Sequence, residues 1–235
     1  MNICFLGNDE RLAYLQQHAS PGVTLDNLAD FRGQKPRPSS IESRLEELEL
    51  AQAVIERCLE AERRGFDAVI TSCFGDPGVD AARELVRIPV IAPGETALLT
   101  ARMLAHHFSL LTPLRETVPL AREQVHRAGM TPFLASIRSL DLPVEAFRNR
   151  GAATVAALAG AVRACVDEDG AELLVLGCAS MSLLADQVST EVGVPVINAV
   201  LLSLRAAEML VGAGLSHSPR TYPRPRKLAA VPATG

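Results

Sequence analysis

The chain has 235 residues and a net charge of −4 at pH 7, and this length allows one large domain or two small ones. Its 48% hydrophobic and 4% aromatic content, with no Trp, indicates an α/β protein rather than a β-sandwich. Neither a dense basic run nor about 20 consecutive apolar residues occurs, so we expect no nucleic-acid partner and no membrane partner. The N-terminus lacks the pattern of a signal peptide, and five cysteines without a CxxC pair indicate reduced thiols in a cytoplasmic protein.

Short apolar runs alternate with longer stretches of helical periodicity along the chain. The runs predict strands at Ile3–Leu6, Gly22–Leu28, Asp67–Ser72, Ile88–Ala92, Phe108–Thr112, Leu173–Gly177 and Pro195–Asn198. The periodic stretches predict one helix from Ser39 or Ser40 to Arg64, and others near Gly78–Val86, Glu95–His106, Val118–Ala128, Ala152–Glu168, Leu183–Val192 and Leu201–Val211. In the less regular part, Val144–Phe147 is predicted as a short strand. This alternation predicts βαβ units, and therefore mainly parallel sheets with helices on both faces.

An internal repeat is the most informative feature of the sequence. GFDAVITSCFGDPG, which starts at Gly65, is similar to GAELLVLGCASMSL, which starts at Gly170. In both segments an acidic residue follows two positions after the glycine, and a cysteine follows eight positions after it. The similarity continues into IPVI at Ile88–Ile91 and VPVI at Val194–Ile197. The same order of elements therefore occurs twice, about half a chain apart.

This repeat predicts two similar α/β/α lobes with the active site in the cleft between them. We expect residues 1–100 with 199–215 to form the first lobe, residues 101–198 to form the second, and residues 216–235 to form a flexible tail. Each lobe places one cysteine, Cys73 or Cys178, at the carboxyl end of a strand, where open α/β sheets bind ligands. The repeat therefore predicts two thiols that face one cleft.

Two facing thiols suit proton transfer on both faces of one carbon. A thiolate removes the proton next to a carbonyl, and a thiol returns a proton from the opposite side. Helix N-termini after both cysteines are expected to favour the thiolate and lower the thiol pKa. The histidines lie at no metal-ligand spacing, and phosphate-binding fingerprints are missing, so we expect neither a metal nor a nucleotide cofactor. A Cys–His nucleophile pair and a two-lobed binding protein without chemistry stay open as alternatives.

Several motifs of the chain resemble one enzyme family. They are SCFGDPG, LGCASM, SIES at Ser40–Ser43, PGETA at Pro93–Ala97 and ETVPLA at Glu116–Ala121. Together they resemble the hydantoin and allantoin racemases of the aspartate/glutamate racemase superfamily, over about Pro38 to Leu210. The resemblance implies a two-lobed α/β fold, homo-oligomers, and racemisation without any cofactor. It also implies that Cys73 and Cys178 form the acid/base pair and that the substrate is a small molecule, a 5-substituted hydantoin or allantoin.

The chain departs from the family pattern at several positions around the expected site. Gly7-Asn8-Asp9 stands where the family has Asn-Pro-Asn, Glu116 replaces an Arg, Ser180 replaces a Gly, and Asn198 replaces an Asp. A different reaction of the superfamily therefore stays open as an alternative. It would be that of an amino-acid racemase, isomerase or decarboxylase that acts on another carbonyl or carboxylate substrate.

Further site residues are expected around the cysteine motifs and on neighbouring strand ends. The expected substrate contacts are Asn8, Ser72, Phe74, Gly75, Thr112, Thr117, Gly177, Ala179 and Asn198. Asp76 is predicted to form the Gly-Asp-Pro-Gly turn, and Glu95 to lie at a helix N-terminus. Cys4, Cys58 and Cys165 are predicted to pack in the core.

Overall fold

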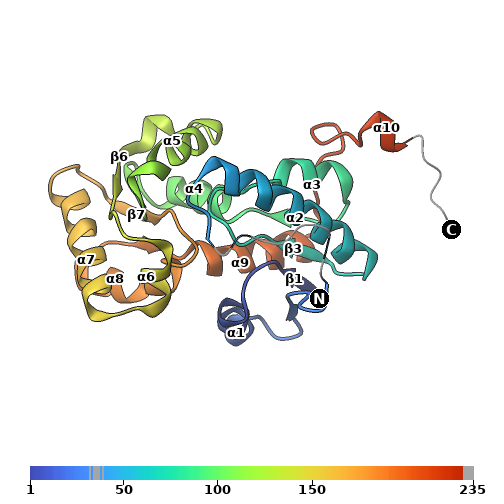
Figure 1. Cartoon of the computed structure of the whole chain (residues 1–235), viewed down its shortest axis with the longest axis horizontal. Coiled ribbons are helices and arrows are strands. Elements are labelled where there is room, and N and C mark those ends of the chain that lie inside the picture. The colour runs from blue at the N-terminus through green and yellow to red at the C-terminus, as the bar shows by residue number, and fades with distance from the viewer. Residues whose placement is uncertain (32, 34–37, 39, 230–235) are drawn as a thin grey trace.

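The computed structural model of the chain contains two sheets, each with four parallel strands (Figure 1). The structure describes residues 1–31, 33, 38 and 40–229. The first sheet has the order β2-β1-β3-β4, with β1 (Asn2–Phe5), β2 (Thr24–Asp26), β3 (Ala68–Ile70) and β4 (Val90–Ile91). The second has the order β6-β5-β7-β8, with β5 (Phe108–Thr112), β6 (Leu134–Ser139), β7 (Leu173–Leu176) and β8 (Val196–Ile197). Both sheets thus follow one strand order, and the predicted α/β fold class is confirmed.

Helices connect the strands and cover both faces of each sheet. They are α1 (Asp9–His18), α2 (Arg44–Arg63), α3 (Val79–Leu85), α4 (Pro93–Leu104), α5 (Val118–Arg127), α6 (Val144–Asn149), α7 (Ala152–Asp167), α8 (Ala185–Val192), α9 (Ala199–Gly212) and α10 (Arg226–Ala229). Short 3-10 turns lie at Arg115–Thr117, Thr131–Phe133 and Ser182–Leu184. Figure 1 shows α6, α7 and α8 gathered at one end of the molecule, and α4 and α9 between the two sheets.

Two helices each follow a strand of one sheet but pack against the other sheet. Helix α4 follows β4 of the first sheet but packs against β7 of the second, with Leu98 and Ala101 beside Phe108 and Leu110. Helix α9 follows β8 of the second sheet but packs against β3 and β4 of the first. The two helices also pack against each other. Because each lobe borrows one apolar helix from the other half of the repeat, neither sheet completes its core alone.

Side-chain direction in the strands matches this two-faced covering. In β1, Cys4 packs with α2 and α3, whereas Ile3 and Phe5 point to the opposite face toward α1 and α9. Cys4, Cys58 and Cys165 are fully buried in the cores, as predicted. Alternate strand residues point to opposite faces, so strands buried on both faces carry continuous apolar runs. These runs made the strands readable from the sequence.

The long helix α2 begins later than the sequence suggested. Ser43 is its N-cap, and the Ser43 Oγ accepts a hydrogen bond from the Glu46 amide at 3.3 Å. The Glu46 carboxylate accepts in turn from the Ser43 hydroxyl and from the Glu42 amide. This reciprocal cap satisfies amides that the first helical turn leaves free. Ser40 therefore lies before the helix, and Ser39 lies outside the described residues.

Three elements differ from the sequence-based expectation. The predicted strand Val144–Phe147 is wrong, because this segment belongs to helix α6. Its buried residues Val144 and Phe147 lie three positions apart, which is helical spacing, and Pro143 and the left-handed Arg150 bound the helix. Helix α1 and the edge strand β6 were not predicted. Every residue of β6 is half-buried, so its sequence carries no clear apolar alternation.

Part of the segment predicted as a flexible tail makes contacts with the first lobe. The Val90 amide donates to His217 Nε2 at 2.8 Å, and Arg83 donates to the Tyr222 hydroxyl at 3.2 Å. Residues 230–235 lie outside the described part of the chain. Among the helices that the structure describes, none combines the length and apolar character needed to cross a membrane.

Gly78→Ala is expected to lower the free energy of unfolding more than Gly65→Ala. Both glycines have left-handed φ angles, +74° and +79°. A Cβ on Gly78 would lie 2.6 Å from the Ala51 carbonyl oxygen in α2, whereas one on Gly65 meets nothing within 4 Å. We expect losses of about 2–5 kcal/mol for Gly78→Ala and about 1–2 kcal/mol for Gly65→Ala. Urea unfolding measures both, and equal losses would contradict the steric role of α2.

Candidate active site

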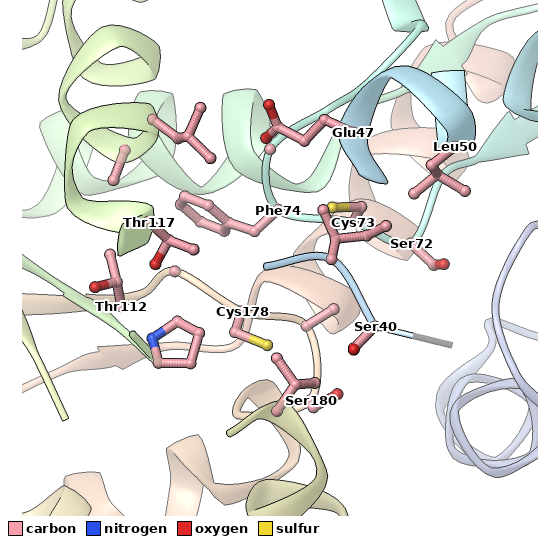
Figure 2. Close-up of a pocket in the computed structure, with 18 of the residues that line it drawn as sticks. Ser40, Glu47, Leu50, Ser72, Cys73, Phe74, Thr112, Thr117, Cys178 and Ser180 are labelled. Atoms are coloured by element: carbon pink, nitrogen blue, oxygen red, sulfur yellow. The ribbon is translucent and has the colours of Figure 1, made fainter. Parts of the chain in front are cut away.

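A cavity of about 500 Å³ lies between the lobes, at the carboxyl ends of strands from both sheets. Its wall contains Cys73 after β3 and Cys178 after β7, and Figure 2 shows these two side chains on opposite sides of the open space. Further wall residues follow β1 and β5 or come from the start of α2 and from α5. The expectation that both cysteines face one cleft is therefore met by the geometry.

The loop that carries Cys73 is held by hydrogen bonds from both lobes. The Asp76 amide donates to the Cys73 carbonyl at 3.1 Å, which closes the turn, and the Ser72 hydroxyl donates to the Leu6 carbonyl. The Asp76 carboxylate accepts from the amides of Gly94 at 3.0 Å and Glu95 at 2.7 Å, at the start of α4. Asp76 thus shapes the loop rather than facing the cavity, whose wall does not include it.

Gln124 in α5 completes this support from the second lobe. Its amide nitrogen donates to the Asp76 carboxylate at 3.0 Å and also to the Phe74 carbonyl oxygen. Burial raises the pKa of Asp76 to about 7, while these amide donors oppose the rise. Glu95, expected at a helix N-terminus, lies in the first turn of α4 and forms an ion pair with Arg83.

The loop that carries Cys178 follows β7, and its first residue, Gly177, packs closely against β5. The Gly177 amide donates to the Leu111 carbonyl at 2.7 Å, and the Met181 amide donates to the Cys178 carbonyl at 3.0 Å. A Cβ on Gly177 would lie 2.9 Å from that Leu111 oxygen and 2.8 Å from the Leu110 side chain. Only glycine lets the strand end approach its neighbour so closely, and this approach sets the position of the next residue, Cys178.

Burial decides the acidity of both thiols. It raises the pKa of Cys73 to about 12, partly offset by the Gly75 amide and reinforced by the Asp76 carboxylate. It also raises the pKa of Cys178, but there the Ser180 amide and the Arg11 charge oppose the rise. The sequence-based expectation of lowered pKa values is therefore wrong. It considered the stabilising amides at the helix N-termini, but the effect of burial on the pKa is larger. Both cysteines line the cavity, and both are only partly exposed.

Most of the expected substrate contacts line the cavity. Asn8, Ser72, Phe74, Gly75, Thr112, Thr117, Gly177 and Ala179 all belong to its wall. The Asn8 side-chain oxygen also caps α1 by accepting from the Arg11 amide at 3.1 Å. The hydroxyls of Thr112 and Thr117 both donate to the Leu114 carbonyl, which leaves their oxygens as acceptors.

Asn198 is the expected contact that the structure does not bring into this wall. It is the N-cap of α9, and its side-chain oxygen accepts from the Leu201 amide at 3.0 Å. Its amide nitrogen donates to the Tyr14 hydroxyl at 2.9 Å. Both polar ends of this side chain are thus occupied by the helix cap and by α1.

Sequence reasoning missed the charged residues of the cavity wall. They are Arg11 from α1, Arg44 and Glu47 from α2, Glu123 and Arg127 from α5, and Arg148 from α6. Arg44 and Glu123 form an ion pair of 2.6 Å that joins the two lobes. No spacing in the sequence marks these residues, because they meet only when helices from both lobes pack together. Within the described residues, no group of three or more His, Cys, Asp or Glu forms a candidate metal site.

Comparison with known proteins places this arrangement in a family. The model of the Asp/Glu/Hydantoin racemase family matches residues 15–207, which is most of the chain. The chain belongs to this family. The matched region contains both cysteine loops and every strand of the two sheets except β1.

Individual relatives agree with this membership. A hydantoin racemase from Rhizobium meliloti is 36% identical over 219 residues, which cover 93% of this chain and 88% of the relative. An allantoin racemase from Klebsiella pneumoniae has a solved structure with a TM-score of 0.87 and 32% identity, over 96% of this chain and 93% of that one. The solved structure of an allantoin racemase from Pseudomonas fluorescens has a TM-score of 0.86 and 32% sequence identity, over 96% of this chain and 97% of that chain. The family and the enzyme class predicted from the sequence are confirmed.

Cys178 is expected to react with iodoacetamide faster than Cys73 in the ligand-free protein. The thiolate is the reactive form, and the Arg11 charge favours it at Cys178, whereas the Asp76 and Glu47 carboxylates oppose it at Cys73. Labelling at mildly alkaline pH, followed by peptide mass spectrometry, gives both rates. The fully buried Cys58 serves as the internal control and should stay unlabelled. Faster labelling of Cys73 would contradict this order.

Proposed function

We propose that this protein is a cofactor-independent racemase of hydantoin-like small molecules, with Cys73 and Cys178 as its acid/base pair. The observation that carries the proposal is the placement of two thiols, from matching positions of two similar lobes, on opposite sides of one cavity. Inversion of a stereocentre needs a base on one face and an acid on the other. The names of the relatives, hydantoin racemase and allantoin racemase, support the substrate class.

In the proposed reaction one cysteine acts as thiolate and the other as thiol. The thiolate takes the proton from the carbon next to the carbonyl, and the electron pair moves into that carbonyl as an enolate. The opposite thiol then gives its proton to the other face of the carbon and becomes the thiolate. The reverse reaction exchanges the two roles, so one site serves both enantiomers.

The raised thiol pKa values are compatible with this chemistry. A C–H group next to a carbonyl is a weak acid. A thiol with a raised pKa gives a more basic thiolate, which narrows the gap between the pKa of the thiol and that of the C–H group. Amides of Gly75 and Ser180 that hydrogen-bond to the sulfurs keep the thiolate accessible despite burial. The raised pKa therefore lowers the fraction of each cysteine present as thiolate and makes that thiolate a stronger base.

A thiol on each side favours racemisation over other reactions of the superfamily. A reaction that moves a proton on one face only would leave the second thiol without a role. The departures from the family pattern at Gly7 and Ser180 lie on the cavity wall, where they affect the choice of substrate rather than the acid/base pair. An amino-acid racemase with the same two bases is the alternative, and a screen of hydantoins, allantoin and amino acids separates the two.

We further propose a cytoplasmic homo-oligomer. Large apolar side chains are exposed on three helices of the described chain: Leu45 and Leu48 on α2, Leu99, Met103 and Leu104 on α4, and Met209 on α9. Burial of such side chains against another copy would remove apolar area from water. Light scattering after size exclusion tests this point, and the mass of a single chain at micromolar concentration would contradict it.

Cys73→Ser and Cys178→Ser are each expected to slow racemisation by about 100–10,000-fold, because a serine hydroxyl is a far weaker acid than a thiol. Each variant should keep exchange of the proton of one enantiomer with deuterated water, since one thiol still works on its own face. Polarimetry and NMR of a 5-substituted hydantoin give the two rates. Cys58→Ala, at a buried cysteine that is not part of the cavity wall, is the control and should retain turnover. Full racemisation by either serine variant would refute the acid/base pair.

A further inference from the structure

One cation of the cavity wall is held without a carboxylate. Arg11 projects from the first turn of α1 into the wall, where its Nη1 lies 3.4 Å from the Ser180 hydroxyl oxygen. Its Nε is buried and has no hydrogen-bond partner among the described residues. No carboxylate in the described part of the chain forms an ion pair with Arg11. In contrast, Arg44 and Arg148 of the same wall each form one.

Those other arginines are neutralised or lie in water. Arg44 pairs with Glu123 at 2.6 Å, and Arg148 has the Glu145 carboxylate at 3.4 Å. Arg127 is exposed, so water screens its charge. Arg11 is left with a charge that burial makes unfavourable, and the nearby Arg148 charge adds to the cost. A buried cation without a counter-ion is unfavourable, and an anionic ligand can offset that cost.

The remaining space in the cavity suggests where such an anion belongs. The volume of about 500 Å³ falls within the range of roughly 300–1,000 Å³ for sites that enclose drug-sized ligands. A bare hydantoin ring is much smaller than this. A ring seated between the two sulfurs therefore leaves room for a substituent, and the Arg11 charge acts on Cys178 and, more weakly, on Cys73. Because Arg11 lines the same cavity as both cysteines, a substituent on the ring can extend toward this guanidinium.

We propose that Arg11 binds a carboxylate at the end of the substrate's side chain, so that the preferred substrates are hydantoins of acidic amino acids. This inference rests on the proposed function, because it names the substrate class of the same site. The guanidinium offers its Nη groups at the cavity wall, and Ser180 adds a hydroxyl beside them. Charge-assisted hydrogen bonds from an arginine fork suit a carboxylate better than a neutral amide.

The test compares two hydantoins that differ only in this group. One carries a 2-carboxyethyl substituent at the stereocentre, and the other carries the neutral 2-carbamoylethyl substituent. The wild-type protein should racemise the acid with a kcat/KM at least about tenfold above that of the amide. Arg11→Met should lower kcat/KM for the acid at least about tenfold more than it lowers kcat/KM for the amide, because the loss of the charge near Cys178 slows both substrates and the loss of the carboxylate contact slows only the acid. Arg11→Lys, which keeps the charge, should retain part of the preference.

The control variant is Arg122→Met, which removes an exposed arginine that is not part of the described cavity wall. It should leave both rates and their ratio unchanged. Thermal unfolding of each variant checks that the fold is intact. Calorimetric affinities for the same two compounds give a readout that does not depend on turnover, and they should show the same preference for the acid and its loss in Arg11→Met.

The possible outcomes separate the two proposals. If neither compound is racemised but the acid still binds more tightly through Arg11, the proposed function fails and the anion site stands. If both are racemised with equal kcat/KM, or if Arg11→Met slows both to the same extent, the carboxylate proposal is overturned and the racemase stands. Equal slowing with a pH profile shifted upward would limit the role of Arg11 to stabilising the Cys178 thiolate.

Discussion

The carboxylate of Asp76 is the constraint on which the geometry of the site depends. It accepts hydrogen bonds from the first amides of α4, and Gln124 of α5 donates both to it and to the Phe74 carbonyl. The Cys73 loop follows the first sheet, whereas α4 and α5 pack on the second. One buried carboxylate thus holds the first thiol in a fixed position relative to the lobe that carries the second. Gly94 is required at this junction, because a Cβ there would meet Gln124 and the Phe74 carbonyl.

The exchange of α4 and α9 extends this coupling through the core. Each helix leaves one sheet and covers the other with buried side chains such as Ala97 and Leu98 of α4 or Val200 and Leu204 of α9. Rotation of one lobe against the other would expose these apolar contacts to water, at a free-energy cost that grows with the area exposed. The carboxyl edges of both sheets consequently stay turned toward one cavity, and the two thiols stay on opposite sides of it. In the proposed racemisation this opposition places a base on one face of the stereocentre and an acid on the other.

What could be predicted from the sequence depended on whether the signal was local. The strand-end cysteines, the repeat and the parallel strands were predictable, because apolar runs and matched spacings report directly on buried strands. The short α6 was assigned wrongly, since the prediction covered only four residues and overlooked that Val144 and Phe147 lie three positions apart, a helical spacing. Arg11 escaped prediction because its role arises only when α1 meets the Cys178 loop of the other lobe. The direction of the thiol pKa shifts was missed for a similar reason, since depth of burial is a property of the folded molecule.

The charges around the two thiols break the symmetry that the repeat creates. Asp76 and Glu47 disfavour a Cys73 thiolate, whereas the guanidinium of Arg11 favours a Cys178 thiolate, so in the proposed mechanism these charges favour the form with a Cys178 thiolate and a Cys73 thiol. Enantiomers have equal free energies in water, and kcat/KM must therefore be equal in both directions at every pH. The asymmetry acts instead on kcat and KM separately: the enantiomer handled by the populated form binds to more of the enzyme and so has the lower KM. Its kcat is lower in the same proportion, because its reaction ends in the less stable form. A pseudo-symmetric fold can in this way give the two enantiomers different rates at saturating concentration without altering the equilibrium between them.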